Sequence, residues 1–155
     1  MNDACPAPPR PQEASKHLAL LLVDDSPHVL RDATSFLRKL GVTVVGSFED
    51  AITALAEVRA LAPDVALVDL RMHGLPGLEA IPRLREMMPD LGIVAMSLTP
   101  GYRRAAMAAG ADEFVDKASF DTELLPAIHR AADAAARRHQ NLPPTPGRAE
   151  AIPCS

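Results

Sequence analysis

The chain has few of the aromatic residues and cysteines on which many binding sites and small secreted scaffolds depend. It has no tryptophan, one tyrosine and four phenylalanines in 155 residues, against 48% hydrophobic residues, so its core must be mainly aliphatic. Its two cysteines, Cys5 and Cys154, lie near opposite ends of the chain. This placement argues against a structural disulfide or a cysteine metal site, and it favours a reducing, cytoplasmic location.

Long hydrophobic runs and an excess of positive charge are also missing. The longest apolar run, residues 18–23, is far too short to cross a bilayer. The first residues lack the basic-then-apolar layout of a signal peptide. The net charge of −4 and the pI near 5.7 argue against binding to nucleic acid or to an anionic membrane.

The middle of the chain differs in composition from its two ends. Prolines are frequent in residues 1–16 and 140–155, and both segments are predicted to be disordered tails. Between them, residues 17–139 have the length and hydrophobicity of one folded domain. The sequence therefore predicts one domain between two proline-rich tails.

Short apolar runs alternate five times with amphipathic stretches in this domain. The runs predict strands, and the stretches predict helices that begin after each strand. Gly41, Gly92 and Gly110 follow helical patterns, at the position where a left-handed residue often ends a helix. Such alternation with short connections is typical of a doubly wound parallel α/β sheet with helices on both faces. We expect strands near 18–24, 42–47, 64–69, 92–97 and 112–116, and helices near 27–40, 49–61, 77–88, 100–109 and 120–139.

Polar residues follow four of the five predicted strands. Asp24 and Asp25 follow the first strand, Asp69 ends the third, Ser97 ends the fourth and Lys117 follows the fifth. In an open parallel α/β sheet, ligands bind outside the carboxyl ends of the strands. Three carboxylates, a hydroxyl and an ammonium group at that edge indicate one site for a divalent cation and a phosphoryl group.

These motifs, in this order, resemble the response-regulator receiver domain of two-component signalling. The resemblance covers about residues 18–135 and rests on the acid pair, on the segment Val68-Asp-Leu-Arg-Met-His-Gly-Leu-Pro-Gly77, on Ser97, and on Gly110-Ala-Asp-Glu-Phe-Val-Asp-Lys117. It implies a flavodoxin-like receiver fold with sheet order 2-1-3-4-5. In that order the first and third strands are neighbours, so the three acids would meet in one crevice.

The resemblance also implies a role for each site residue. Asp69 would be the phospho-acceptor, and Lys117 and Ser97 would contact the phosphoryl oxygens. Mg²⁺, or alternatively Mn²⁺, would be bound directly by Asp25, by Asp69 and by the backbone carbonyl of Arg71, with Asp24 acting mostly through water. Ser97 and Phe114 would form the switch that responds to phosphorylation.

Each of these residues also has a simpler interpretation. Asp24 and Asp25 could be acids that favour the N-terminus of the next helix. Ser97 could be a turn hydroxyl, Lys117 a solvated lysine and Phe114 a core residue. Two departures from the family pattern concern the site: His73 stands where proline is usual, and Leu98 stands where a small residue is usual.

The resulting prediction is a stand-alone receiver that assists its own phosphorylation and dephosphorylation and is not a conventional enzyme. A histidine kinase or phosphotransfer protein would be its donor. An unknown protein partner would bind the face formed by the fourth helix, fifth strand and fifth helix, with the receiver a monomer or weak dimer. Two alternatives stay open: a receiver-fold interaction scaffold without phosphorylation, and a receiver cut from a hybrid kinase or transcription factor.

Overall fold

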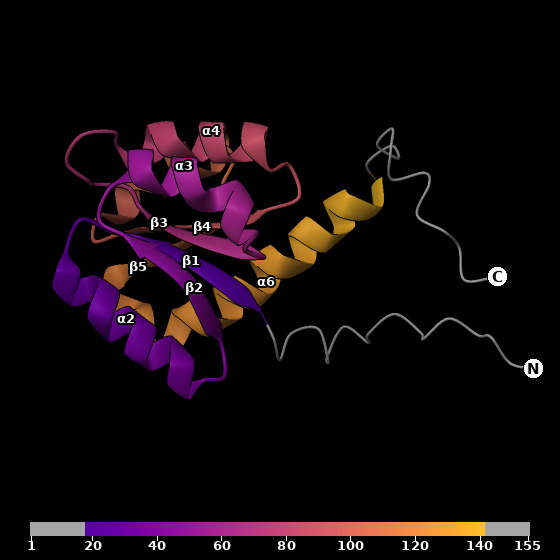
Figure 1. The fold of residues 1–155 in the computed structure, drawn as a ribbon. Coiled ribbons are helices and arrows are strands. Elements are labelled where there is room, and N and C mark those ends of the chain that lie inside the picture. Colours follow the sequence, from indigo (N-terminus) through magenta and orange to yellow (C-terminus); the bar gives the residue numbers. More distant parts are fainter. Residues whose placement is uncertain (1–17, 142–155) are drawn as a thin grey trace, which may run out of the picture.

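The computed structural model describes residues 18–141, and these residues form a five-stranded parallel sheet covered by helices (Figure 1). The predicted tails, 1–16 and most of 140–155, lie outside the described residues. The strand order is β2-β1-β3-β4-β5, which confirms the predicted order and fold class. The strands are β1 (Ala19–Val23), β2 (Thr43–Phe48), β3 (Val65–Asp69), β4 (Gly92–Ser97) and β5 (Glu113–Asp116).

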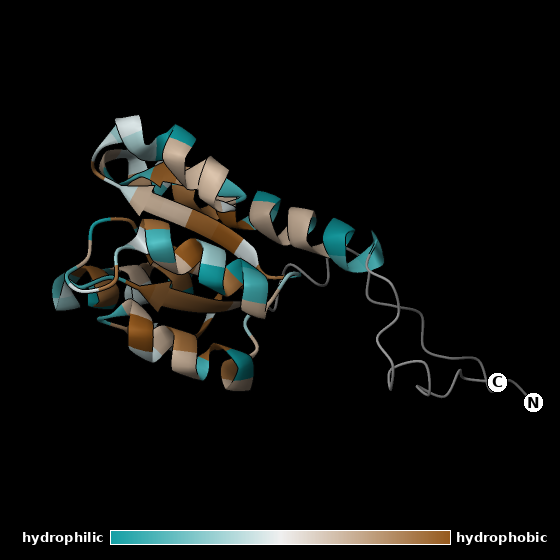
Figure 2. Cartoon of the chain, turned by 90° about the horizontal axis from the view of Figure 1, so that it is seen from above, coloured by the Kyte–Doolittle hydropathy of each residue, from teal (hydrophilic) through white to brown (hydrophobic). Residues whose placement is uncertain are grey.

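The helices lie on both faces of the sheet. One face is covered by α3 (Ala51–Leu61), α4 (Gly77–Met87) and α5 (Arg103–Ala109), and the other by α2 (Pro27–Lys39) and α6 (Phe120–Asn141). Figure 2 shows the strands as mainly hydrophobic and the helices as alternating between hydrophobic and hydrophilic residues. Strands β3 and β4 are buried along their whole length, as expected for parallel strands with helices on both faces.

Local signals position the first helix after the acid pair. Ser26 caps α2, its hydroxyl accepting a hydrogen bond from the Val29 amide at 3.4 Å, and Pro27 is the first helical residue. These are favoured residues at a helix start, because the first amides have no partner within the helix and proline has no amide hydrogen there. The chain therefore turns sharply after Asp24 and Asp25, which leaves both acids at the carboxyl end of β1.

The predicted elements differ from the observed ones in three places. The predicted helix 100–109 begins as a 3-10 turn, Pro100–Tyr102, before α5. The predicted helix 120–139 continues to Asn141, so the first two residues of the predicted tail 140–155 are helical. Gly41 and Gly110 have the expected positive φ, but Gly92 does not: it begins β4, where a Cβ would lie 2.8 Å from the Ala131 carbonyl oxygen of α6. The close packing of β4 against α6 therefore explains why this position is a glycine.

No helix in the described range 18–141 is long and apolar enough to cross a membrane.

Candidate phosphoryl and metal site

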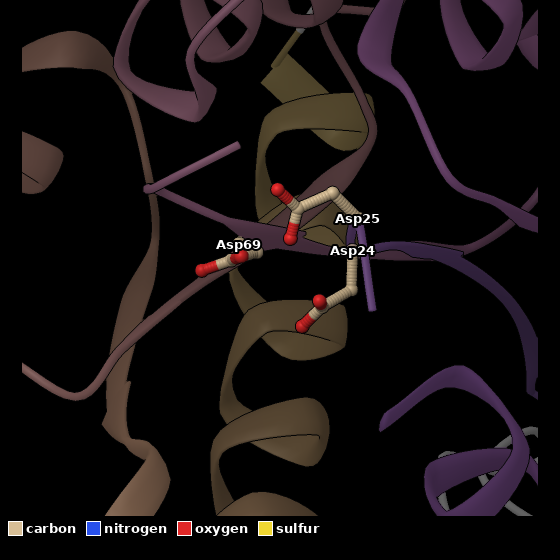
Figure 3. A group of neighbouring side chains, drawn as sticks. All are labelled: Asp24, Asp25 and Asp69. Carbon is tan, nitrogen blue, oxygen red and sulfur yellow. The ribbon is translucent and has the colours of Figure 1, made fainter. Parts of the chain in front are cut away.

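The carboxyl ends of β1 and β3 bring three carboxylates together (Figure 3). Asp24 and Asp25 follow β1, Asp69 ends β3, and these strands are hydrogen-bonded neighbours. Each residue offers an oxygen within 4.8 Å of the other two. Oxygen ligands at this spacing suit a hard divalent cation, so the side chains present fit the predicted magnesium site.

Lys117 joins the acids from the end of β5. Its ammonium group lies 2.6 Å from Asp24 Oδ2 and 3.3 Å from Asp69 Oδ1. Asp24 and Asp69 are almost completely buried, so their negative charges depend on this ammonium for compensation. The alternative that Lys117 is an ordinary solvated lysine does not fit these contacts.

The surroundings of Asp69 oppose its ionisation. Burial raises its pKa above the ordinary 3.8, and the negative charge of Asp24 raises it further. Lys117 and the Arg71 amide, which donates to Asp69 Oδ1 at 3.3 Å, act in the opposite direction but do not cancel this shift. A cation or an added positive charge would therefore stabilise the ionised carboxylate.

Asp24 and Asp25 differ in the contacts that their oxygens already make. Asp24 Oδ1 accepts from the Ser26 amide at 2.9 Å, and Oδ2 accepts from Lys117. Asp25 is half-buried, and its Oδ2 accepts from the backbone amide of His73 at 3.2 Å and lies 2.7 Å from His73 Nδ1. Partial burial raises the pKa of Asp25, but the contacts with His73 lower it more, so its net pKa lies below 3.8. Asp25 is therefore the more accessible candidate for a metal ligand.

We expect Asp25→Asn to weaken magnesium binding more than Asp24→Asn. Asp25 can offer an oxygen to the cation, whereas both oxygens of Asp24 are committed to a lysine and an amide. The affinity should fall by about one to two orders of magnitude for Asp25→Asn and by less for Asp24→Asn. Isothermal calorimetry with Mg²⁺ measures both. Equal losses would show that the two acids have the same role.

Two further predicted residues lie at the same edge of the sheet. Ser97 is 1% exposed, and its Oγ accepts a hydrogen bond from the Thr99 amide at 3.0 Å, as in the turn-hydroxyl interpretation. A hydroxyl can accept and donate at once, so this bond leaves its O–H available for a phosphoryl oxygen. Leu98 is 71% exposed, which excludes the view that it packs under a helix.

Phe114 belongs to the hydrophobic core and is 3% exposed. The guanidinium group of Arg103 lies 5.0 Å from the centre of its ring, within the range of a cation–π contact. Arg103 and Phe114 also line a hollow of about 310 Å³ between α5, β5 and α6. Phe114 is therefore buried in the core, a position that fits both the core-residue and the switch-residue interpretations.

Two contributions to the site were not predicted from the sequence. Gly77, the first residue of α4, packs so closely on the backbone of Asp69 and Leu70 that any Cβ would overlap it. His73 contacts Asp25, although the sequence indicated only that proline was missing at that position. A histidine in the loop after Asp69 was the available signal, since imidazole both hydrogen-bonds to carboxylates and binds metals.

We expect the Asp69→Asn protein to be more stable than the wild type in metal-free buffer at neutral pH. The pKa of Asp69 is higher in the folded state than its ordinary 3.8, so above the folded value its ionisation opposes folding. As the pH falls through the folded value towards 3.8, the folded state takes up a proton and this cost disappears. The gain in melting temperature should therefore shrink in acid. A gain that grows as the pH falls would contradict this explanation.

Comparison with known proteins agrees with this geometry. The family model for the response regulator receiver domain matches residues 20–129. The chain is 34% identical over 117 residues to the nitrate/nitrite response regulator NarL of Escherichia coli, covering 73% of this chain and 54% of NarL. It is 32% identical over 114 residues to the response regulator GacA of Pseudomonas viridiflava, covering 72% and 53%. The chain thus spans about half the length of these curated relatives.

Solved structures show the same fold. The response regulator TrrA of Thermotoga maritima, determined in complex with Mg²⁺ and BeF, is similar with a TM-score of 0.67 and 26% identity, covering 74% of this chain and 98% of TrrA. A LuxR-family regulator from Aurantimonas gives a TM-score of 0.71 and 29% identity, covering 76% and 86%. The acidic group described above is typical of receiver domains that bind Mg²⁺.

Proposed function

The chain belongs to the response-regulator receiver family, and on that premise we propose that Asp69 accepts a phosphoryl group in a magnesium-dependent reaction. The donor class is a histidine kinase or a phosphotransfer protein. One observation carries the proposal: a buried carboxylate at a strand end has an oxygen within 4.8 Å of two further acids and lies 3.3 Å from the Lys117 ammonium.

Each site residue has a separate role in the proposed reaction. Asp25 and Asp69 would hold the cation, with the Arg71 carbonyl as a further ligand, and Asp24 would orient Lys117 through their 2.6 Å contact. When bound, the cation supplies positive charge to phosphoryl oxygens. Lys117 and the Ser97 hydroxyl would contact the remaining oxygens. Asp69 would attack phosphorus, forming an acyl phosphate while the phosphorus–nitrogen bond of the phosphohistidine breaks.

The alternative function is an interaction scaffold with the receiver fold and no phosphorylation. Two departures favour it, namely His73 on the metal ligand Asp25 and the exposed Leu98 beside Ser97. Incubation with acetyl phosphate, with Mg²⁺ or with chelator, followed by intact-mass measurement, separates the two. A phosphate adduct that needs Mg²⁺ supports phosphotransfer, and no adduct under either condition supports the scaffold.

We propose that the output is protein binding at the face made by α5, β5 and α6. The hollow on this face contains Phe114, which lies three residues before Lys117 on β5. A movement of Lys117 would therefore be transmitted to the hollow through a backbone segment of only three residues. NarL and GacA contain about as many residues again as the matched region, so the output of those proteins is not transferred to this chain. The hollow is lined by Arg103, Phe114, Thr122, Glu123, Pro126 and Arg130.

We expect Leu98→Ala to speed both phosphorylation by acetyl phosphate and loss of the phosphoryl group, each by about two- to tenfold. A branched side chain directly after Ser97 restricts in-line approach to phosphorus from the donor and from water. Because Leu98 is 71% exposed, its truncation should change stability by only about 0.5 kcal/mol. Time-resolved intact mass measures both rates. Unchanged rates with an unchanged melting temperature would show that Leu98 does not restrict access.

A further inference from the structure

His73 lies beside one of the three acids of the candidate cation site. It lies in the loop between β3 and α4, and its imidazole Nδ1 is 2.7 Å from Asp25 Oδ2. The backbone amide of His73 donates to the same oxygen at 3.2 Å, so the backbone and the ring both hold the residue beside Asp25. The side chain is otherwise fully exposed. The imidazole therefore faces Asp25 on one side and water on the others.

The pair formed by His73 and Asp25 has the spacing of two ligands on one metal ion. Nitrogen and oxygen ligands bind first-row divalent metals at about 2.0–2.2 Å, so adjacent ligands around an octahedral ion lie about 3 Å apart. The observed 2.7 Å is within a few tenths of an ångström of that separation. The same 2.7 Å is also the length of a hydrogen bond, and His73 does not belong to the group of oxygens that lie within 4.8 Å of one another. The exposed ring would therefore have to turn for one metal ion to bind both His73 and Asp25.

The charge around this pair favours a cation. Among the described residues 18–141, Lys117 is the one ammonium that contacts the three acids, so the ionised group has an excess of two negative charges there. Lys117 contacts Asp24 and Asp69, and Asp25 makes its hydrogen bonds with His73. Asp25 is therefore the acid of the three that has no ammonium group of the described residues in contact with it, and a cation can bind it without displacing one.

A second histidine–aspartate pair in the described part of the chain lacks this surrounding charge. His139 Nδ1 lies 3.3 Å from Asp90 Oδ2, near the end of α6. The neighbouring Pro89 carbonyl accepts hydrogen bonds from Arg85 and Arg138, so two guanidinium groups lie close to that pair. Positive charge opposes cation binding there, which makes His139 a matched control.

We infer that His73 is a nitrogen ligand that, together with Asp25, makes the cation site prefer a borderline metal such as Co²⁺, Ni²⁺ or Zn²⁺ over Mg²⁺. Imidazole binds these metals well, whereas Mg²⁺ is bound through oxygen. The inference rests on the proposed function, because it concerns the cation of the same site. It adds a metal-selecting residue outside the three acids.

Calorimetry on untagged protein tests the inference with Ni²⁺ as the borderline metal and Mg²⁺ as the hard one. His73→Gln keeps the backbone amide and a polar side chain but removes the imidazole. We expect it to weaken Ni²⁺ binding at least about tenfold and to change Mg²⁺ binding about twofold or less. His139→Gln should change neither affinity. With Zn²⁺, the imidazole nitrogen resonances of one histidine should shift in the wild type and in His139→Gln, but not in His73→Gln.

The outcomes distinguish this inference from the proposed function. Equal losses of Ni²⁺ and Mg²⁺ affinity in His73→Gln, or unchanged Ni²⁺ affinity, would overturn the role of His73 as a nitrogen ligand and leave the magnesium site standing. A wild-type protein that binds Ni²⁺ through His73 but does not bind Mg²⁺ would support the inference and contradict magnesium-dependent phosphorylation. A wild type that binds neither metal would overturn both.

Discussion

The Asp69→Asn protein is expected to form no phosphate adduct when it is incubated with acetyl phosphate and Mg²⁺. In the proposed reaction of the wild type, a carboxylate oxygen of Asp69 would attack phosphorus, the phosphorus–oxygen bond to acetate would break, acetate would leave, and an acyl phosphate would remain on Asp69. A carboxamide keeps the size of the side chain but is a much poorer nucleophile. Intact-mass measurement should therefore show the adduct in the wild type and none in the variant.

Asp116 provides a matched control for this experiment. It ends β5 at the same edge of the sheet, but its Oδ1 accepts a hydrogen bond from the Ala118 amide and it is not one of the three grouped acids. Asp116→Asn should keep the full adduct, because asparagine can accept the same hydrogen bond. A full adduct on Asp69→Asn would show that another residue is the acceptor, and peptide mapping would identify that residue.

Replacement of Lys117 by methionine is expected to destabilise the metal-free protein by about 3–5 kcal/mol, the usual cost of removing one partner from a buried ion pair. Lys117 lies 2.6 Å from the nearly inaccessible Asp24 and 3.3 Å from Asp69. Methionine roughly fills the space but leaves two buried carboxylates that repel each other. Urea unfolding at neutral pH in chelator measures the loss of free energy of unfolding.

Two further variants identify the cause of the loss. Adding Asp24→Asn to Lys117→Met removes one of the uncompensated charges and should recover much of the stability. Lys39→Met changes an exposed lysine at the end of α2 and should cost no more than about 0.5 kcal/mol. A loss below about 1 kcal/mol for Lys117→Met would show that water, and not Lys117, compensates Asp24.

The predictions for Asp69 and Lys117 separate chemistry from stability. Asp69→Asn should abolish phosphorylation while making the metal-free protein more stable, because a buried carboxylate with a raised pKa opposes folding. Lys117→Met should reduce both phosphorylation and the stability of the protein. Opposite signs of stability change at two residues 3.3 Å apart would show that the site is held in a strained, charged state that favours cation binding.

The fold and the positions of the acids could be predicted from local patterns in the sequence. Apolar runs with helical stretches between them predicted the five strands, and the motifs around Asp24, Asp69, Ser97 and Lys117 predicted the strand order through resemblance to a family. These features are readable because burial requires a regular hydrophobic pattern along each element, and that pattern is local in the chain. The acids were predictable for the same reason, since each follows directly on a buried strand.

The pairing of polar groups at that edge depends instead on contacts between segments that are distant in the sequence. Lys117 reaches Asp24 across 93 residues of sequence, and His73 reaches Asp25 across 48, although both acids follow the same strand. Adjacent acids after one strand look equivalent in a sequence. They become different only when neighbouring strands and loops bring one ammonium and one imidazole into reach, because each side chain then turns toward the partner that best compensates its charge. The exposure of Leu98 and the burial of Phe114 were likewise decided by packing between elements distant in sequence.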